Sequence, residues 1–167
     1  MDKAGNISDV KSFTYYYDED EPVISASISP NTNSEKMDNS GKNPILKYTI
    51  SDKTLKSYEI ELNDEKINTS GSSGEVELKN VEEGENDIYI TSIDKAGNDS
   101  EQELSYYKDT VAPEKGTVRI TPKTGFFNSS NQIPIVKWDG ITDDNLSCVQ
   151  VKIDDGEYKE LGKTSKG

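Results

Sequence analysis

Residues 94–98 of this chain read Asp94-Lys95-Ala96-Gly97-Asn98, and the same five residues occur 92 positions earlier as Asp2-Lys3-Ala4-Gly5-Asn6. Glycine and asparagine tolerate the positive φ angles that a tight hairpin requires. An aspartate side chain can accept hydrogen bonds from the amides of such a turn. Both copies are therefore predicted to be turns that join two antiparallel strands.

The residues that follow the two turns also match each other, in the same order along the chain. The offset varies between 90 and 92, as small insertions and deletions in loops would produce. The matching pairs are Tyr15-Tyr16 and Tyr106-Tyr107, Asp18 and Asp109, Pro22 and Pro113, Ile28-Ser29-Pro30 and Ile120-Thr121-Pro122, Lys47-Tyr48 and Lys137-Trp138, and residues 60–64 and 151–155. A repeat of about 91 residues predicts three parts: the C-terminal strand of a preceding repeat at 1–19, a complete repeat at 20–109, and the N-terminal part of a following repeat at 110–167.

Apolar side chains recur at every second position within residues 20–109, which predicts strands with one buried face. The expected strands lie at residues 24–28, 46–50, 57–62, 75–78, 88–93 and 104–106. The strand at 88–93 is apolar on both faces, as expected for a central strand. Turn-forming residues such as Asn63-Asp64 separate the strands, and no long segment carries a helical apolar stripe. Six or seven short strands predict an all-β antiparallel sandwich.

Composition narrows the function classes. The 167 residues carry 32 acidic and 19 basic side chains, a net charge of −13, which argues against binding to nucleic acid or to an anionic membrane. No apolar run is long enough for a membrane span. Histidine is absent and there is one cysteine, so the commonest general base and any internal disulfide are missing. We therefore expect the chain not to be an enzyme.

Residues 86–98, together with the following Tyr107-Lys108-Asp109-Thr110-Val111-Ala112-Pro113, resemble the repeat boundary of bacterial immunoglobulin-like domains of cell-surface and adhesin-type proteins. In those families a strand ends in an Asp-x-Ala-Gly-Asn turn, and one more strand leads to an Asp-Thr-x-x-Pro linker. The resemblance implies tandem immunoglobulin-like or fibronectin-III-like sandwiches, secreted and associated with the bacterial cell wall. Their first partners would be neighbouring repeats of the same polypeptide. The first linker, at residues 18–22, departs from this pattern because it lacks the threonine.

Acidic residues gather at the two expected boundaries between repeats. They are Asp18, Asp20 and Glu21 at the first boundary, and Asp94 and Asp109 at the second. Calcium binds six to eight oxygen ligands, and related arrays sometimes hold calcium at their joints, so the resemblance raises calcium as a cofactor here. The alternative is that these are solvated charges in an acidic chain. The sequence favours that alternative because no Asp-x-Asp-x-Asp-Gly loop is present.

Two other groups of residues invite a functional interpretation. Phe126 and Phe127 are the best aromatic candidates for contact with a ligand, whereas Tyr48 and Trp138 are expected in the core. Asp154-Asp155 could be the paired carboxylates of a glycosidase, but Asp155-Gly156 is a hairpin signal and the turn interpretation is preferred.

The function that these observations favour is that of a non-catalytic structural spacer. Tandem repeats of a secreted bacterial surface protein would project or link a functional domain, with possible adhesion. Two alternatives stay open: a module that binds a glycan or a host protein, and an accessory region of a large extracellular carbohydrate-active enzyme. Residues 10–17 are expected to form a strand that needs a partner sheet, in this chain or in another molecule.

Overall fold

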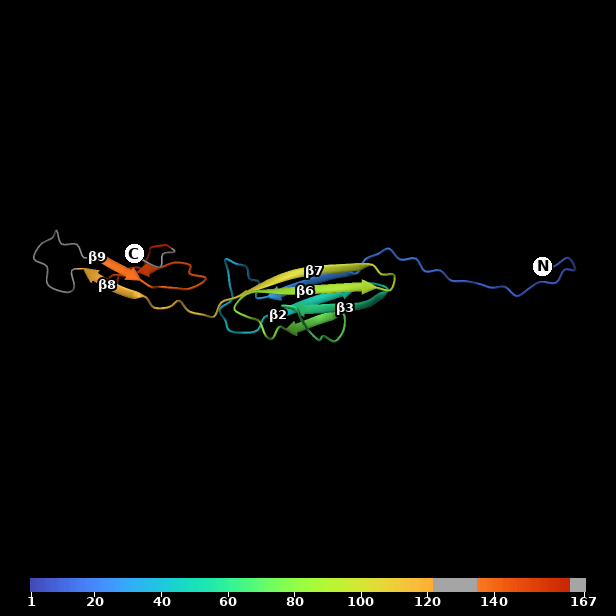
Figure 1. Cartoon of the computed structure of the whole chain (residues 1–167), viewed down its shortest axis with the longest axis horizontal. Coiled ribbons are helices and arrows are strands. Elements are labelled where there is room, and N and C mark those ends of the chain that lie inside the picture. The colour runs from blue at the N-terminus through green and yellow to red at the C-terminus, as the bar shows by residue number, and fades with distance from the viewer. Residues whose placement is uncertain (122–134, 163–167) are drawn as a thin grey trace, which may run out of the picture. The chain divides into compact units, whose positions relative to one another are not determined.

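The computed structural model describes residues 1–121 and 135–162, and over these residues it consists of strands and loops (Figure 1). Contacts divide the chain into two units. The first comprises Met1–Lys36 and Lys42–Tyr107, and the second comprises Met37–Gly41 and Lys108–Gly167. The described residues contain no helix with the length and apolar character to cross a membrane.

Two sheets make up the first unit. The three-stranded sheet has the order β1-β2-β5, and the four-stranded sheet has the order β4-β3-β6-β7. The strands are β1 (Val23–Ser29), β2 (Ile45–Ser51), β3 (Leu55–Leu62), β4 (Glu65–Lys66), β5 (Ser73–Glu77), β6 (Gly84–Asp94) and β7 (Asp99–Lys108). The prediction of an all-β fold with antiparallel sheets is confirmed, and the two sheets enclose one core as in a β-sandwich.

The core of the first unit follows from the alternation in the sequence. Alternate residues of β2 are buried, and β3 and β6 contribute buried side chains from the other sheet. The buried apolar side chains are Leu46, Tyr48, Ile50, Ile60, Leu62, Leu78, Ile88, Ile90 and Tyr106. Strand β6 lies between β3 and β7, but only one of its faces is buried: Tyr89 is 39% exposed. The central position expected of this strand is observed, and its outer face is not covered by a second layer within the described residues.

The β3–β4 hairpin shows how local residue types set a connection. Asn63 and Asp64 have φ angles of 49° and 64°, and they link the paired residues Leu62 and Glu65. Positive φ at both central residues is the requirement of a two-residue turn between strands, and asparagine and aspartate accept it. The predicted turn is confirmed. Strand β4 was not predicted because its two residues carry no apolar side chain.

Among the described residues of the second unit, four short strands form two antiparallel pairs. Strand β8 (Thr117–Thr121) pairs with β9 (Ile135–Asp139), and β10 (Gln150–Val151) pairs with β11 (Lys159–Glu160). Residues 154–156 lie in the turn between β10 and β11, where Asp154 has a φ of 50°, so the turn interpretation of this carboxylate pair is confirmed. Tyr48 is a core residue as predicted, whereas Trp138 in β9 is only half-buried.

The N-terminal segment differs from its prediction. Residues 10–17 do not form a strand, and their large side chains are exposed. A single strand is stable only when its backbone groups pair with a neighbour, and no other described residue pairs with these. Residues 10–17 therefore have the sequence pattern of a strand, but they form none because no segment in the described part of this chain pairs with them.

Candidate functional site

Asp94 organises the turn that connects β6 to β7. Its Oδ1 accepts hydrogen bonds from the backbone amides of Gly97 at 2.6 Å and Asn98 at 2.8 Å, and its Oδ2 accepts one from Asn98 Nδ2 at 2.9 Å. The Asp94 amide donates to the Asn98 carbonyl at 3.0 Å, and Gly97 supplies a φ of 101°. The Asp94 side chain is 0% exposed. This motif therefore forms a closed, hydrogen-bonded loop.

The first copy of the motif folds in the same way. Asn6 donates from its backbone amide to Asp2 Oδ1 at 2.9 Å and from Nδ2 to Asp2 Oδ2 at 2.7 Å. The Asp2 amide donates to the Asn6 carbonyl at 2.9 Å, and Gly5 has a φ of 94°. Three hydrogen bonds and the glycine conformation are thus shared by the two copies. The five residues fold locally in both copies. Asp94 differs from Asp2 in being buried, and its second amide donor is Gly97, where Asp2 has Ala4.

The residues that precede β1, residues 18–22, are hydrogen-bonded to the Asp94 turn and to residues beside it. Asn98 Nδ2 donates to the backbone carbonyls of Asp18 and Asp20, each at 3.2 Å. Ser100 Oγ donates to the carbonyl of Pro22 at 2.5 Å. Thr54 Oγ1, from the short β2–β3 connection, donates to Asp18 Oδ2 at 2.9 Å. We call this set of bonds, made by Thr54, Asn98 and Ser100 to residues 18–22, the linker clamp.

Three carboxylates meet at the linker clamp. Oxygen atoms of Asp18, Asp52 and Asp94 lie within 4.8 Å of one another. Of the residues predicted for calcium, the structure thus brings together Asp18 and Asp94, and it adds Asp52, which sequence reasoning missed. Asp52 lies in a turn after β2, where its Oδ1 accepts the amide of Thr54 at 2.6 Å.

The other three predicted calcium residues have different places. Asp20 and Glu21 line a surface hollow of about 550 Å³ together with Asp18 and Asp52. Asp109 belongs to the second unit, where its backbone amide donates to the Asp38 carbonyl at 3.0 Å. Asp109 is not a member of the three-carboxylate cluster.

The carboxylates of this cluster already accept hydrogen bonds from neighbouring donors. Both oxygens of Asp94 accept bonds from the turn, and Thr54 Oγ1 lies 3.5 Å from Asp94 Oδ2 and 2.9 Å from Asp18 Oδ2. Three carboxylates supply fewer ligands than the six to eight oxygens of a calcium shell, unless several bind through both oxygens. The donor set therefore fits a clamp that works without an ion, and the calcium site stays a prediction.

The ionisation of Asp94 follows from the same contacts. Burial on its own would raise the pKa of this carboxyl. The hydrogen bonds from the Asn98 side chain and from the amides of Asn98, Gly97 and Ala96 act in the opposite direction and hold the pKa below its usual value. Asp94 is thus a buried carboxylate that is kept charged by donors.

A second buried polar residue was missed by sequence reasoning. Asn86, at the start of β6, is 0% exposed. Its Oδ1 accepts bonds from the Glu82 amide at 2.7 Å and from Asn63 Nδ2 at 2.9 Å, and its Nδ2 donates to the Glu82 carbonyl at 2.9 Å. It also lies 3.4 Å from the carbonyl of Tyr106 in β7. Asn86 joins two loops and two strands, and only the two-residue spacing from Ile88 could have placed it on the buried face.

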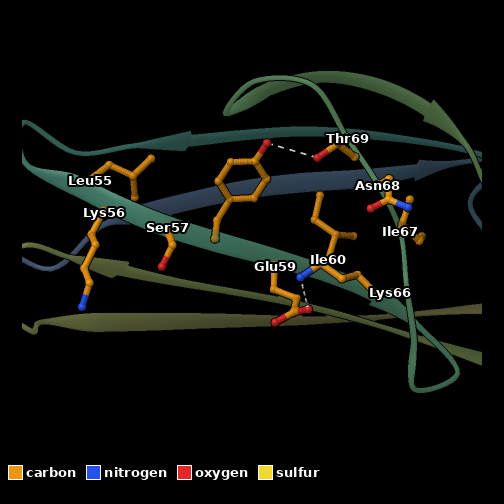
Figure 2. A pocket seen from close by; sticks show the side chains of 10 residues that line it. Leu55, Lys56, Ser57, Glu59, Ile60, Lys66, Ile67, Asn68 and Thr69 are labelled. Carbon is orange, nitrogen blue, oxygen red and sulfur yellow. Dashed lines mark hydrogen bonds and ion pairs between the residues drawn. The ribbon is translucent and has the colours of Figure 1, made fainter.

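A groove of about 340 Å³ lies between β3 and the chain that follows β4 (Figure 2). The groove exists because β4 pairs only with Glu61 and Leu62, which leaves the rest of β3 facing residues 66–69. An ion pair from Lys66 to Glu59 and a hydrogen bond between Tyr58 and Thr69 cross it. The Tyr58 hydroxyl also donates to the Gly71 carbonyl. Since two pairs of its polar side chains, Lys66–Glu59 and Tyr58–Thr69, already bond each other across it, we assign this groove no ligand.

No family model, curated protein or solved structure matches this chain. Phe126 and Phe127, the residues predicted for contact with a ligand, lie outside the described residues. Function must therefore be argued from the first unit and its linker clamp.

Proposed function

We propose that this chain is a non-catalytic spacer segment of a secreted bacterial surface protein, built from tandem immunoglobulin-like repeats that project or link another domain. The observation that carries the proposal is the position of the two chain ends on the sandwich. The chain arrives at the Asn98 end of β7, where Pro22 is bonded to Ser100. It departs after Lys108, at the other end of the same strand.

The length of β7 determines how much length each repeat adds to the polypeptide. Strand β7 has ten residues, and a strand rises about 3.3 Å per residue, so arrival and departure are separated by about 30 Å. A domain with both ends on one side would add no length to a polypeptide. A domain that the chain enters at one end and leaves at the other lengthens it with every repeat, which is what a spacer requires.

The order of the strands supports an immunoglobulin-like assignment. Immunoglobulin-type sandwiches place strands A, B and E in one sheet and C, F and G in the other. Strands β1, β2 and β5 correspond to A, B and E, and β3, β6 and β7 correspond to C, F and G. The extra strand β4 pairs with β3, so it extends the second sheet.

Equivalent pairings in the two units support a repeat. In the first unit Ile28 pairs with Leu46, and in the second unit Ile120 pairs with Val136. These are the residues that the sequence repeat equates, as are the neighbouring pairs Ala26–Tyr48 and Val118–Trp138. A shift of the strand pairing by one residue would move every side chain of the strand to the opposite face of the sheet. Agreement in register between the two units is therefore a stringent match.

Pulling on single molecules tests the spacer function. A chain held at residues 1 and 167 should show one cooperative rupture for residues 20–109, followed by a gain of roughly 300 Å from about 90 residues at up to 3.6 Å each. Extension without a rupture would overturn the proposal, because a spacer that yields at low force cannot hold another domain at a distance.

A further inference from the structure

We infer that residues 8–18 are a β7-type strand that docks on the open β6-type edge of an immunoglobulin-like sandwich other than residues 20–109. This inference rests on the proposed function and names the partner surface of the N-terminal segment. The Asp2–Asn6 turn already has three of the hydrogen bonds of the turn that precedes β7.

The residues that follow the two turns can be aligned. Ile7 has no counterpart after Asn98, and beyond it residues 8–18 align with 99–109 at an offset of 91 without a further gap. The aligned pairs are Phe13 and Leu104, Thr14 and Ser105, Tyr15 and Tyr106, Tyr16 and Tyr107, and Asp18 and Asp109. The inward positions of β7 therefore correspond to Phe13 and Tyr15.

Burial differs sharply between the two segments. Tyr106 is 0% exposed, and Leu104 packs against the same core. Their counterparts Tyr15 and Phe13 are 83% and 91% exposed. Such a segment has two exposed apolar side chains and an unpaired backbone. Docking on a sheet stabilises it if the sheet offers both a hydrogen-bonding edge and an apolar inner face.

The sandwich of this chain cannot be that partner. Its β7 position is already filled, and the linker clamp holds Asp18 at the Asn98 end of β7. A strand in the β7 position would carry Asp18 at the opposite end, about 33 Å away for ten residues. The five residues from Asp18 to the start of β1 at Val23 reach at most about 18 Å. Docking therefore needs a different sandwich.

The β6–β7 contact defines what the partner must offer. It needs an unpaired strand edge equivalent to that of β6, and an inner face that accepts an aromatic ring where Tyr106 lies. A polar donor equivalent to Asn86 Nδ2, which approaches the Tyr106 carbonyl, would meet the carbonyl of Tyr15. The partner is thus a sandwich of the same class whose last strand is supplied by residues 8–18.

Replacing β7 by the N-terminal segment tests the inference. In the full chain, residues 101–108 are exchanged for a second copy of residues 10–17, which leaves Ser100 of the linker clamp in place, and the same exchange with Tyr106→Ser is the matched control. We expect the exchanged chain to unfold cooperatively, with a midpoint within about 5 °C of the native chain, and the control to lose at least twice that.

Loss of the cooperative transition in the exchanged chain, or binding of a dye specific for exposed apolar surface, would overturn the inference. An exchanged chain whose stability is indifferent to Tyr106→Ser would also overturn it, because Tyr15 would then not be the anchoring residue. The rupture of the native chain under force does not depend on either result, so failure here is distinct from failure of the spacer proposal.

Discussion

The side chain of Asn98 donates a hydrogen bond to the backbone carbonyl of Asp18, a residue that precedes it by 80 positions. The same Nδ2 donates to Asp20 and to Asp94. The last residue of a locally folded turn thereby fixes the direction in which the chain approaches the sandwich.

Removing this side chain should release the linker. Asn98→Ala deletes the bonds to Asp18 and Asp20 and leaves the buried Asp94 with fewer donors, so we expect a loss of about 1–3 kcal/mol in the free energy of unfolding. Urea denaturation measures it. Asn68→Ala is the matched control because Asn68 is exposed, and an equal loss in both variants would contradict the clamp.

Asn86→Ala should be more costly than Asn98→Ala. It removes the bonds that the Glu82 amide and Asn63 Nδ2 donate to the buried Asn86 side chain, which costs about 2–4 kcal/mol. Urea denaturation measures this loss in the free energy of unfolding. A loss below about 1 kcal/mol would show that the Asn86 network adds little to the fold.

Ser92, unlike Asn86, is a buried polar residue whose side chain has no hydrogen-bond partner among the described residues. It is 4% exposed on the inner face of β6. Since burying an unpaired hydroxyl is unfavourable, Ser92→Ala should leave stability unchanged or raise it by about 1 kcal/mol. A clear loss of stability would mean that the hydroxyl bonds a buried water molecule.

Acid should loosen the Asp94 turn. The folded state holds the pKa of Asp94 below its usual value of 3.8, so this carboxylate stabilises the fold above the unfolded pKa. That contribution is lost as the pH falls through the lower, folded pKa. Stability of the native chain should therefore decline below about pH 4, and Asp94→Asn should flatten this decline. Identical pH profiles for the two chains would contradict the assignment.

Calcium should have little effect on the stability of the fold if the linker clamp works through hydrogen bonds alone. We expect the same unfolding midpoint in millimolar calcium and in chelator. A rise of several degrees with calcium that disappears in Asp52→Asn would instead establish a metal site at Asp18, Asp52 and Asp94.

The sequence predicted the features that depend on neighbouring residues. Alternating apolar positions located six strands, and Asn63-Asp64 and Asp94–Asn98 identified two turns. Features that depend on distant segments were missed: Asp52 and Thr54 meet Asp18 only after folding, and Asn86 has no apolar signature. Residues 10–17 have a strand pattern without a strand, because pairing needs a second segment and cannot be read from one.

Backbone order in the linker tests the central claim most directly, since a spacer must hold its incoming chain in one direction. Amide relaxation on the full chain gives order parameters for residues 18–21, which can be compared with those of β2 and of the exposed residues 7–14. We predict values of about 0.85 for residues 18–21, equal to those of β2. Values below about 0.6, equal to those of residues 7–14, would contradict a clamped linker and with it the spacer function.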